Sequence, residues 1–262
     1  MDLNGKVVLI SGATGGMGEE ITKLLSKEGC KLALFARREE KLKKLSSKLS
    51  NDETECIYKK CDVKNIKDVK EAVEFTHKKF GKIDIAILAA GILVPIPIEI
   101  FNSDLIRDSM ETNFFGHLYF IEQLLPILKA QKSGTIAAVS TLPDKRGVPG
   151  WSTYGCSKAA VSWLMDSLRA EAKKKYNLNF ITIKPGSVLT PMIKSYHRQG
   201  AVTSEKAAKY IVDGIKKGKR IIQFPLYQVL PNIVTNLIPT VVYDAGPAEQ
   251  QRGNDFPVVE EE

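Results

Sequence analysis

The chain has 262 residues, of which 44% are hydrophobic, and its formal net charge is +8 at pH 7. This length and apolar content suit one large α/β domain with a sizeable buried core. The four cysteines lack a Cys-x-x-Cys spacing, so we expect no metal site and no redox dithiol. The basic runs 173–175 and 216–220 fall where helices should end, a place that favours lysine, so we expect no nucleic-acid partner.

The first residues, MDLNGKVVLISG, lead directly into an apolar run, without the basic and then apolar stretches of a signal peptide. We therefore expect a cytoplasmic protein with reduced, mostly buried cysteine thiols. The histidines at positions 77, 117 and 197 are scattered along the chain, and we assign them no role.

Apolar runs rich in β-branched residues alternate with segments whose apolar residues recur at helical spacing. The expected strands lie at residues 6–11, 31–36, 55–60, 83–89, 135–140, 180–184 and 220–224. The expected helices lie at residues 16–27, 39–49, 66–80, 104–128, 154–176 and 204–216. This alternation requires parallel pairing with helices on both faces, so we predict a single α/β domain over residues 1–262, built on a doubly wound parallel sheet.

The stretch SGATGGMG, from Ser11 to Gly18, follows the first expected strand and opens the first expected helix. Glycines at positions 12, 16 and 18 permit a tight turn, close approach of the backbone to phosphate and close helix packing, and the helix N-terminus offers unpaired N–H groups. The pattern predicts a dinucleotide phosphate site. Its alternative is a glycine-rich turn without a ligand.

The end of the second expected strand reads LFARREE. Ala36 stands where an NAD-specific fold usually places the carboxylate that binds the ribose 2′-hydroxyl, and Arg37 and Arg38 follow it. Because arginine can fork onto a 2′-phosphate, the pattern favours NADP(H) over NAD(H). The alternative is that these arginines only begin a solvent-exposed helix.

Small or polar residues follow the later strands as well. In an open parallel sheet, the carboxyl ends of the strands border the ligand crevice. We therefore expect one crevice to be faced by Asp62, Val63, Ala89, Ala90, Gly91, Ser140, Thr141, Pro185 and Gly186.

Tyr154 and Lys158 stand four positions apart in an expected helix and so share one face, about one turn apart. A phenol with an ordinary pKa of about 10 is a poor acid or base near neutrality unless a nearby cation favours the phenolate. Lys158 can supply that cation and can also donate to ribose hydroxyls. Taken alone, two unrelated residues on a helix surface would show the same spacing.

The segment 226–262 begins with LYQVLPNIVTNLIPTVVY, whose prolines, glutamine and asparagines argue against a membrane span. We expect a covering or interfacial pair of helices instead. Its target is the subunit's own pocket, a partner subunit or a membrane surface, and we expect membrane contact only through this segment.

From about Leu3 to Thr190 the chain resembles the short-chain dehydrogenase/reductase family. The resemblance rests on ordered motifs: SGATGGMG for TGxxxGxG, with serine for threonine, NFFG at 113–116, Tyr-x-x-x-Lys at 154–158 and PGSVLT at 185–190. The family implies a seven-stranded, Rossmann-like sheet, a homodimer or homotetramer, and hydride transfer between a nicotinamide and a carbonyl or alcohol.

The resemblance implies that Tyr154 is the general acid in reduction and the base in oxidation, while Lys158 lowers the pKa of Tyr154 and binds the nicotinamide ribose. It implies that Asn113 anchors a water that relays protons to bulk solvent; the alternative is a local hydrogen bond that bends its helix. The expected cofactor-binding residues are Gly12, Thr14, Gly15, Gly16, Met17, Gly18, Arg37, Arg38, Asp62, Val63, Ala89, Ala90, Gly91, Tyr154, Lys158, Pro185, Gly186, Val188 and Thr190.

The sequence departs from the family after the fourth expected strand, where LAAG, from Leu88 to Gly91, replaces the usual NNAG. Both asparagine amides are missing, which puts the hydrogen bonding that steadies the central strands in doubt.

The substrate-binding serine of the family usually stands 13 residues before the tyrosine, which points to Thr141 here. The neighbouring Ser140 is the competing hydroxyl. Adjacent strand residues point in opposite directions, so we expect only one of the two hydroxyls to bind the substrate carbonyl. Both faces of the strand are apolar, so the alternation of side chains does not show which hydroxyl it is. The family spacing favours Thr141.

Residues 187–204 are where the family keeps its substrate loop. Apolar contacts are expected there and on the opposite wall from Met192, Ile193, Tyr196, Leu93, Val94, Pro149 and Trp151. The sequence thus predicts an NADP(H)-dependent carbonyl reductase or alcohol dehydrogenase acting on a largely apolar small molecule. The alternatives are packing of these residues only against the C-terminal segment, a non-catalytic NADP(H)-binding regulatory module, and a membrane-attached scaffold.

Overall fold

The computed structural model describes residues 1–50, 54–192 and 200–245. Its centre is a parallel sheet of seven strands in the order β3-β2-β1-β4-β5-β6-β9. The strands are β1 (Val7–Ser11), β2 (Lys31–Ala36), β3 (Cys56–Lys60), β4 (Ile85–Leu88), β5 (Gly134–Val139), β6 (Leu178–Pro185) and β9 (Ile221–Phe224). The order reverses between β1 and β4, and an open α/β sheet binds its ligands at such a switch point. The predicted doubly wound sheet is confirmed.

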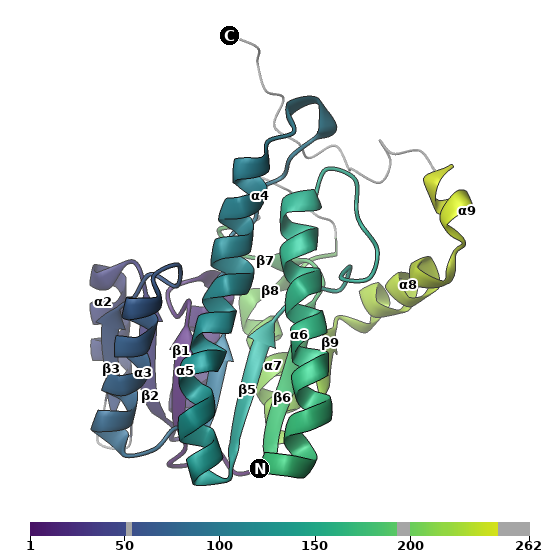
Figure 1. Cartoon of the computed structure of the whole chain (residues 1–262). Coiled ribbons are helices and arrows are strands. Elements are labelled where there is room, and N and C mark those ends of the chain that lie inside the picture. The colour runs from purple at the N-terminus through teal and green to yellow at the C-terminus, as the bar shows by residue number, and fades with distance from the viewer. Residues whose placement is uncertain (51–53, 193–199, 246–262) are drawn as a thin grey trace.

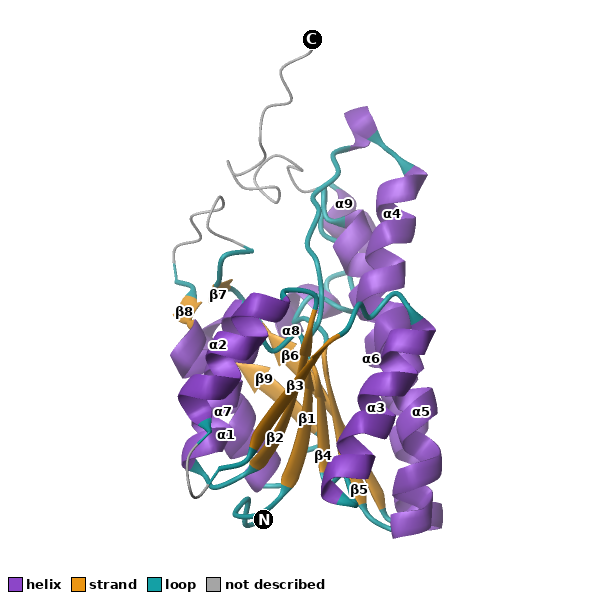
Figure 2. Ribbon diagram, turned by 90° about the vertical axis from the view of Figure 1, so that its left-hand side faces the viewer, coloured by secondary structure: helices purple, strands orange, loops and turns teal. Residues whose placement is uncertain are grey.

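Helices cover both faces of the sheet (Figure 2). One face carries α1 (Gly16–Lys27), α2 (Glu39–Leu49) and α7 (Ser204–Lys216), and the other carries α3 (Ile66–Phe80), α5 (Gly116–Gln131) and α6 (Ser152–Tyr176). Each face has its own core, with Leu25 and Ile211 buried in the first and Phe120 and Met165 in the second. All five residues of β1 are buried, because a central strand covered on both sides needs a continuous apolar run.

The helix expected at 104–128 is interrupted in the structure. It consists of α4 (Ser103–Met110), a π-helical turn η2 (Glu111–Phe115) and α5, which follow one another from the upper part of Figure 1 to its bottom. The residue at the centre of that turn is Asn113. Single π-turns inside helices are frequent at functional sites because the extra residue re-aims a side chain.

The substrate loop expected at 187–204 contains a short parallel pair, β7 (Val188–Leu189) and β8 (Val202–Thr203). Two of the apolar contacts expected in this loop, Ile193 and Tyr196, lie outside the described residues, as does the end of the C-terminal segment from 246 onward. A short 3₁₀ turn, η1 (Ile98–Ile100), precedes α4.

The C-terminal segment forms two helices, α8 (Leu226–Leu237) and α9 (Thr240–Asp244), which extend beyond β9 at the right of Figure 1. The polar side of α8 faces the protein: Gln228 accepts from the Ser187 N–H at 2.8 Å, and Asn232 donates to the Leu142 carbonyl at 3.0 Å. The opposite side is apolar and exposed at Leu226, Tyr227, Leu230, Ile233, Val234 and Leu237, followed by Val241 and Val242 of α9. None of the helices in the described ranges reaches the length and apolarity that crossing a bilayer requires.

Candidate active site

A cleft of about 550 Å³ lies along the carboxyl ends of the strands. Every residue of the expected cofactor-binding set borders it except Lys158, which lies buried next to it. The cleft is also bordered by Glu19, Lys41, Cys61, Ile92, Leu93, Thr112, Pro191 and Met192. The structure therefore brings together residues from the ends of five strands, but Ser140 and Thr141, which were expected at the same crevice, do not border this cleft.

The glycine loop opens this cleft toward the start of α1. Gly12 has φ of +72°, and a Cβ there would lie 2.6 Å from the backbone nitrogen of Ala90, so only glycine lets β1 and β4 approach this closely. The N-cap residue of α1 is Gly15, which has no side chain to cap the helix. The first N–H groups of α1 are thus free to bind an anion, which fits the diphosphate of a dinucleotide.

Positive charge gathers where β2 ends. The Arg38 guanidinium donates to the Thr14 carbonyl oxygen at 2.6 Å and to the Thr14 hydroxyl at 3.1 Å, which ties it to the glycine loop. Arg37 and Lys41 are exposed and border the same cleft, and Ala36 brings no carboxylate. Arg37, Arg38 and Lys41 make this end of the cleft electropositive.

The pair Tyr154 and Lys158 lies in the first two turns of α6. The ammonium of Lys158 lies 5.7 Å from the centre of the Tyr154 ring and donates to the Val139 carbonyl at 2.8 Å. The Lys158 residue is only 3% exposed, and this burial lowers its pKa to about 7. A ligand with hydroxyl oxygens at this place would replace part of the lost hydration.

Asn113 is fully buried and bonds to two other elements. Its Oδ1 accepts from the Ile92 N–H at 2.7 Å, and its Nδ2 donates to the Ile92 carbonyl at 3.0 Å and to the Ser157 hydroxyl at 2.9 Å. Ser157 in turn donates to the carbonyl of Tyr154 at 2.8 Å. Asn113 therefore ties the loop after β4 to the first turn of α6 rather than bonding to its own helix.

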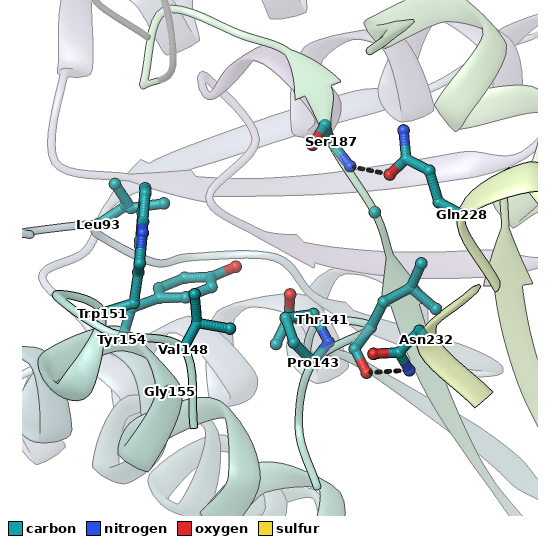
Figure 3. Close-up of a pocket in the computed structure, with 12 residues that line it drawn as sticks. Leu93, Thr141, Pro143, Val148, Trp151, Tyr154, Gly155, Ser187, Gln228 and Asn232 are labelled. Carbon is teal, nitrogen blue, oxygen red and sulfur yellow. Dashed lines mark hydrogen bonds between the residues drawn. The ribbon is translucent and has the colours of Figure 1, made fainter. Parts of the chain in front are cut away.

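A second cavity, of about 210 Å³, adjoins the cleft. It is lined by Leu93, Thr141, Leu142, Pro143, Val148, Trp151, Tyr154, Gly155, Gly186, Ser187, Gln228 and Asn232. In Figure 3 the hydroxyl groups of Tyr154 and Thr141 point into the same space. Two hydroxyls directed at one point can both bond to a single substrate oxygen.

Ser140 lies away from both cavities. It is fully buried, and its hydroxyl donates to the carbonyl oxygen of Lys158 at 2.8 Å and lies 2.8 Å from the Ser162 hydroxyl. The two adjacent hydroxyls thus point to different sides, and of the two, Thr141 is the one that reaches the cavity.

Only some of the residues expected to contact the substrate line the smaller cavity. Leu93 and Trp151 line the cavity, whereas Met192 borders the cofactor cleft instead. Val94 and Pro149 line neither, and the Val94 carbonyl accepts a hydrogen bond from the hydroxyl of Thr153.

Sequence reasoning missed Gln228 and Asn232, which close the cavity from α8. Their spacing of four within an apolar stretch was the available signal, because it places both amides on one helix face.

His117, which was assigned no role in the sequence analysis, lies next to the end of β4, where LAAG replaces NNAG. It forms a hydrogen bond with the backbone of Leu88 at the end of β4, and burial lowers its pKa to about 3, so the imidazole is neutral. It supplies a side-chain hydrogen bond at the strand end where both family amides are absent. The central strands are therefore supported from α5.

The chain matches the family model of the short chain dehydrogenases over residues 6–201. It is 33% identical to an uncharacterized oxidoreductase of Listeria monocytogenes over 228 residues, which is 82% of this chain and 92% of the relative. It is 31% identical to the 11-beta-hydroxysteroid dehydrogenase-like protein 2 of Arabidopsis thaliana over 254 residues, which is 92% of this chain and 80% of the relative.

The fold is also that of solved structures. A short-chain dehydrogenase/reductase from Burkholderia phymatum, crystallised with NAD, superposes with a TM-score of 0.85 at 17% identity, covering 95% of this chain and 98% of the other. At 17% identity this likeness shows the fold alone. The match to the family model and the identity to the relatives show that the sequence is similar as well. The chain therefore belongs to the short-chain dehydrogenase/reductase family of oxidoreductases.

Proposed function

We propose that the protein is an NADP(H)-dependent carbonyl reductase or alcohol dehydrogenase that acts on a largely apolar small molecule. The observation that carries this proposal is that Tyr154, Leu93 and Gly186 border both the cofactor cleft and the smaller cavity. A substrate oxygen beside Tyr154 would then lie next to the place where a nicotinamide would bind.

When bound, NADP(H) would supply or accept the hydride. In reduction, the hydroxyls of Thr141 and Tyr154 hydrogen-bond to the substrate carbonyl oxygen and polarise it, and Tyr154 then donates its proton to that oxygen. In oxidation Tyr154 takes the proton from the alcohol. The Lys158 ammonium favours the phenolate of Tyr154 and donates to ribose hydroxyls.

Asn113 holds the first turn of α6 and the loop after β4 in place. Its Oδ1 accepts one bond, from the Ile92 N–H, and a carbonyl oxygen has two lone pairs. The remaining acceptor position is available to a water that passes protons between Lys158 and bulk solvent.

The preference for NADP(H) rests on Arg37, Arg38 and Lys41. Their charges would pair with a 2′-phosphate, and Ala36 offers no acceptor for the 2′-hydroxyl of NAD(H). The preference for an apolar substrate rests on Leu93, Val148 and Trp151 in the cavity wall. The name of the Arabidopsis relative, which refers to a steroid alcohol, agrees with a substrate of this kind.

We also propose a cytoplasmic homo-oligomer that pairs through the apolar face of α8 and α9, defined by the exposed side chains named above. A contiguous apolar face of this kind is unusual on the surface of a monomer. The cysteines at 30, 56, 61 and 156 are all free, which agrees with a reducing compartment.

The experiment is a screen of ketones and aldehydes with NADPH and with NADH, followed by nucleotide absorbance. Wild type should oxidise NADPH with apolar carbonyl compounds, and the Tyr154→Phe variant should bind NADPH normally yet lose turnover. Equal rates in the two proteins would refute the role of Tyr154. A preference for highly charged sugars would refute the apolar substrate, and NADPH binding without turnover of any carbonyl would favour a non-catalytic binding module.

A further inference from the structure

Buried polar groups connect the catalytic helix to the end of β6. The Ser140 hydroxyl lies 2.8 Å from both the Lys158 carbonyl oxygen and the Ser162 hydroxyl oxygen, and its single proton is shared between these two acceptors. The Ser162 hydroxyl donates to the carboxylate of Asp144, and that carboxylate pairs with the ammonium of Lys184 at 2.6 Å. Each of these five residues is at most 7% exposed.

The members of this network come from four parts of the site. Ser140 follows β5, Asp144 lies in the loop between β5 and α6, Ser162 is in α6 and Lys184 is in β6. Asp144 directly follows Leu142 and Pro143, which line the substrate cavity. Lys184 is followed by Pro185, which borders the cofactor cleft. The network therefore joins both walls of the site to the helix that carries Tyr154.

The ion pair is a poor source of net stability. The Asp144 and Lys184 side chains are 3% and 5% exposed, so both charges have lost their hydration, and their mutual attraction does little more than offset that loss. The ion pair matters more for the positions of the segments that it joins than for the free energy of folding. A buried carboxylate and ammonium that must stay in contact restrict the placement of the loop relative to the strand end.

We propose that Asp144 and Lys184 are positioning residues. Their ion pair, extended through two serine hydroxyls, fixes the turn of α6 that carries Tyr154 and Lys158 relative to Thr141. This inference rests on the proposed function, because the groups it aligns are the proposed proton donor, its cation and the carbonyl's hydrogen-bond partner. It gives Ser140, the hydroxyl that does not reach the cavity, a role in holding the backbone of α6.

The first test is Ser162→Ala, which breaks the network without changing charge. A misplacement by a fraction of an ångström lowers kcat, and we expect a fall of about 10- to 100-fold. The Kd for NADPH should change less than kcat does, because the glycine loop that would hold the diphosphate is not part of the network. Deuterated NADPH should give a larger isotope effect on kcat, and Ser162→Thr, which keeps the hydroxyl, should recover most of the rate.

The matched control is Val212→Ala, a buried truncation in α7 that borders neither cavity. It should lower the thermal midpoint with kcat unchanged. If Ser162→Ala lowers kcat no more than Val212→Ala at an equal loss of stability, the positioning role is refuted.

The ion pair is tested by Asp144→Asn, Lys184→Met and the double variant. If both residues act through one network, the kcat of the double variant should be no lower than that of the less active of the two single variants. Additive losses would refute a shared role. If a single variant does not fold, the positioning role is tested by the kcat of Ser162→Ala and of the double variant.

Hydrogen exchange followed by mass spectrometry separates this inference from the proposed function, since it needs no substrate. In Ser162→Ala, exchange should rise in residues 141–151 and in the first turns of α6, while β1 and α1 stay as in wild type. A uniform rise, or none, would refute the inference even in an active enzyme. If wild type reduces no carbonyl but the local rise is seen, the proposed function fails and the network still positions this part of the fold.

Discussion

The two hydroxyls after β5 differ in what they touch. Thr141 lines the substrate cavity beside Tyr154, and Ser140 bonds to the backbone of Lys158. Strand parity alone left the choice open, because both faces of a central strand are apolar. The loop geometry after Val139 turns the Thr141 hydroxyl to the cavity and the Ser140 hydroxyl to α6, which supports the proposed role of Thr141.

We predict that Thr141→Ala lowers kcat by roughly 100- to 1000-fold, the range for removing one donor to a developing oxyanion. Thr141→Ser should retain most of the activity because it keeps the hydroxyl. Steady-state kinetics with a carbonyl found in the NADPH screen measures both. A small loss for Thr141→Ala together with a large loss for Ser140→Ala would reverse the assignment.

Lys158 makes stability depend on pH. Its pKa is about 7 in the folded chain against an ordinary 10.5, so between these values the unfolded chain binds the proton more strongly. The cost of burying the ammonium is present in full below pH 7 and disappears as the pH rises toward 10.5. The free energy of unfolding therefore gains up to about 1.4 kcal/mol for each pH unit in this window.

The check is urea unfolding of the nucleotide-free protein at several pH values, for wild type and Lys158→Met. The stability of wild type relative to the variant should rise with pH across the window. Lys43→Met, which changes an exposed lysine of α2, should give a difference that does not vary with pH. A flat curve for Lys158→Met would mean that the ammonium is not disfavoured by burial.

At the scale of elements, the sequence predicted most of the sheet but not the break before α5. The strands were found because buried parallel strands are continuous apolar runs, as in β1. Helical spacing continues through Glu111–Phe115, so local pattern could not reveal the π-turn that aims Asn113 at Ile92. Nor could it show that α8 docks with its amides inward, since that depends on contacts with Ser187 and Leu142, far away in the chain.

Gln228 holds α8 to the site, and we predict that Gln228→Leu loosens it. The Ser187 N–H would lose its partner and the Gly200 carbonyl would keep only the bond from the Tyr227 hydroxyl, which should lower stability by about 1–3 kcal/mol. The KM for the carbonyl substrate should rise, with NADPH affinity unchanged. Denaturant unfolding and initial rates measure these effects, and Gln223→Leu, at an exposed position of β9, is the control. An unchanged KM would show that α8 does not shape the cavity.

At the scale of the whole molecule, α8 and α9 present a contiguous apolar face to solvent. Leu237 is 79% exposed and Val241 76% exposed, although the neighbouring amides are turned inward. The polar side of α8 lies against its own protein and its apolar side faces outward, which supports the proposed contact with a second copy.

We predict that Leu230→Ser combined with Leu237→Ser converts the oligomer to a smaller species. Light scattering should show a reduced mass, while Phe75→Ser in α3 leaves the mass as in wild type. If the mass is unchanged and binding to lipid vesicles is lost instead, the face meets a membrane surface and not a second copy.

The position of α8 in the chain also sets an order in time. Every residue that borders the cofactor cleft lies at or before Met192, whereas the substrate cavity is complete only with Gln228 and Asn232. During synthesis the nucleotide site is therefore fully translated before the cavity has its last wall.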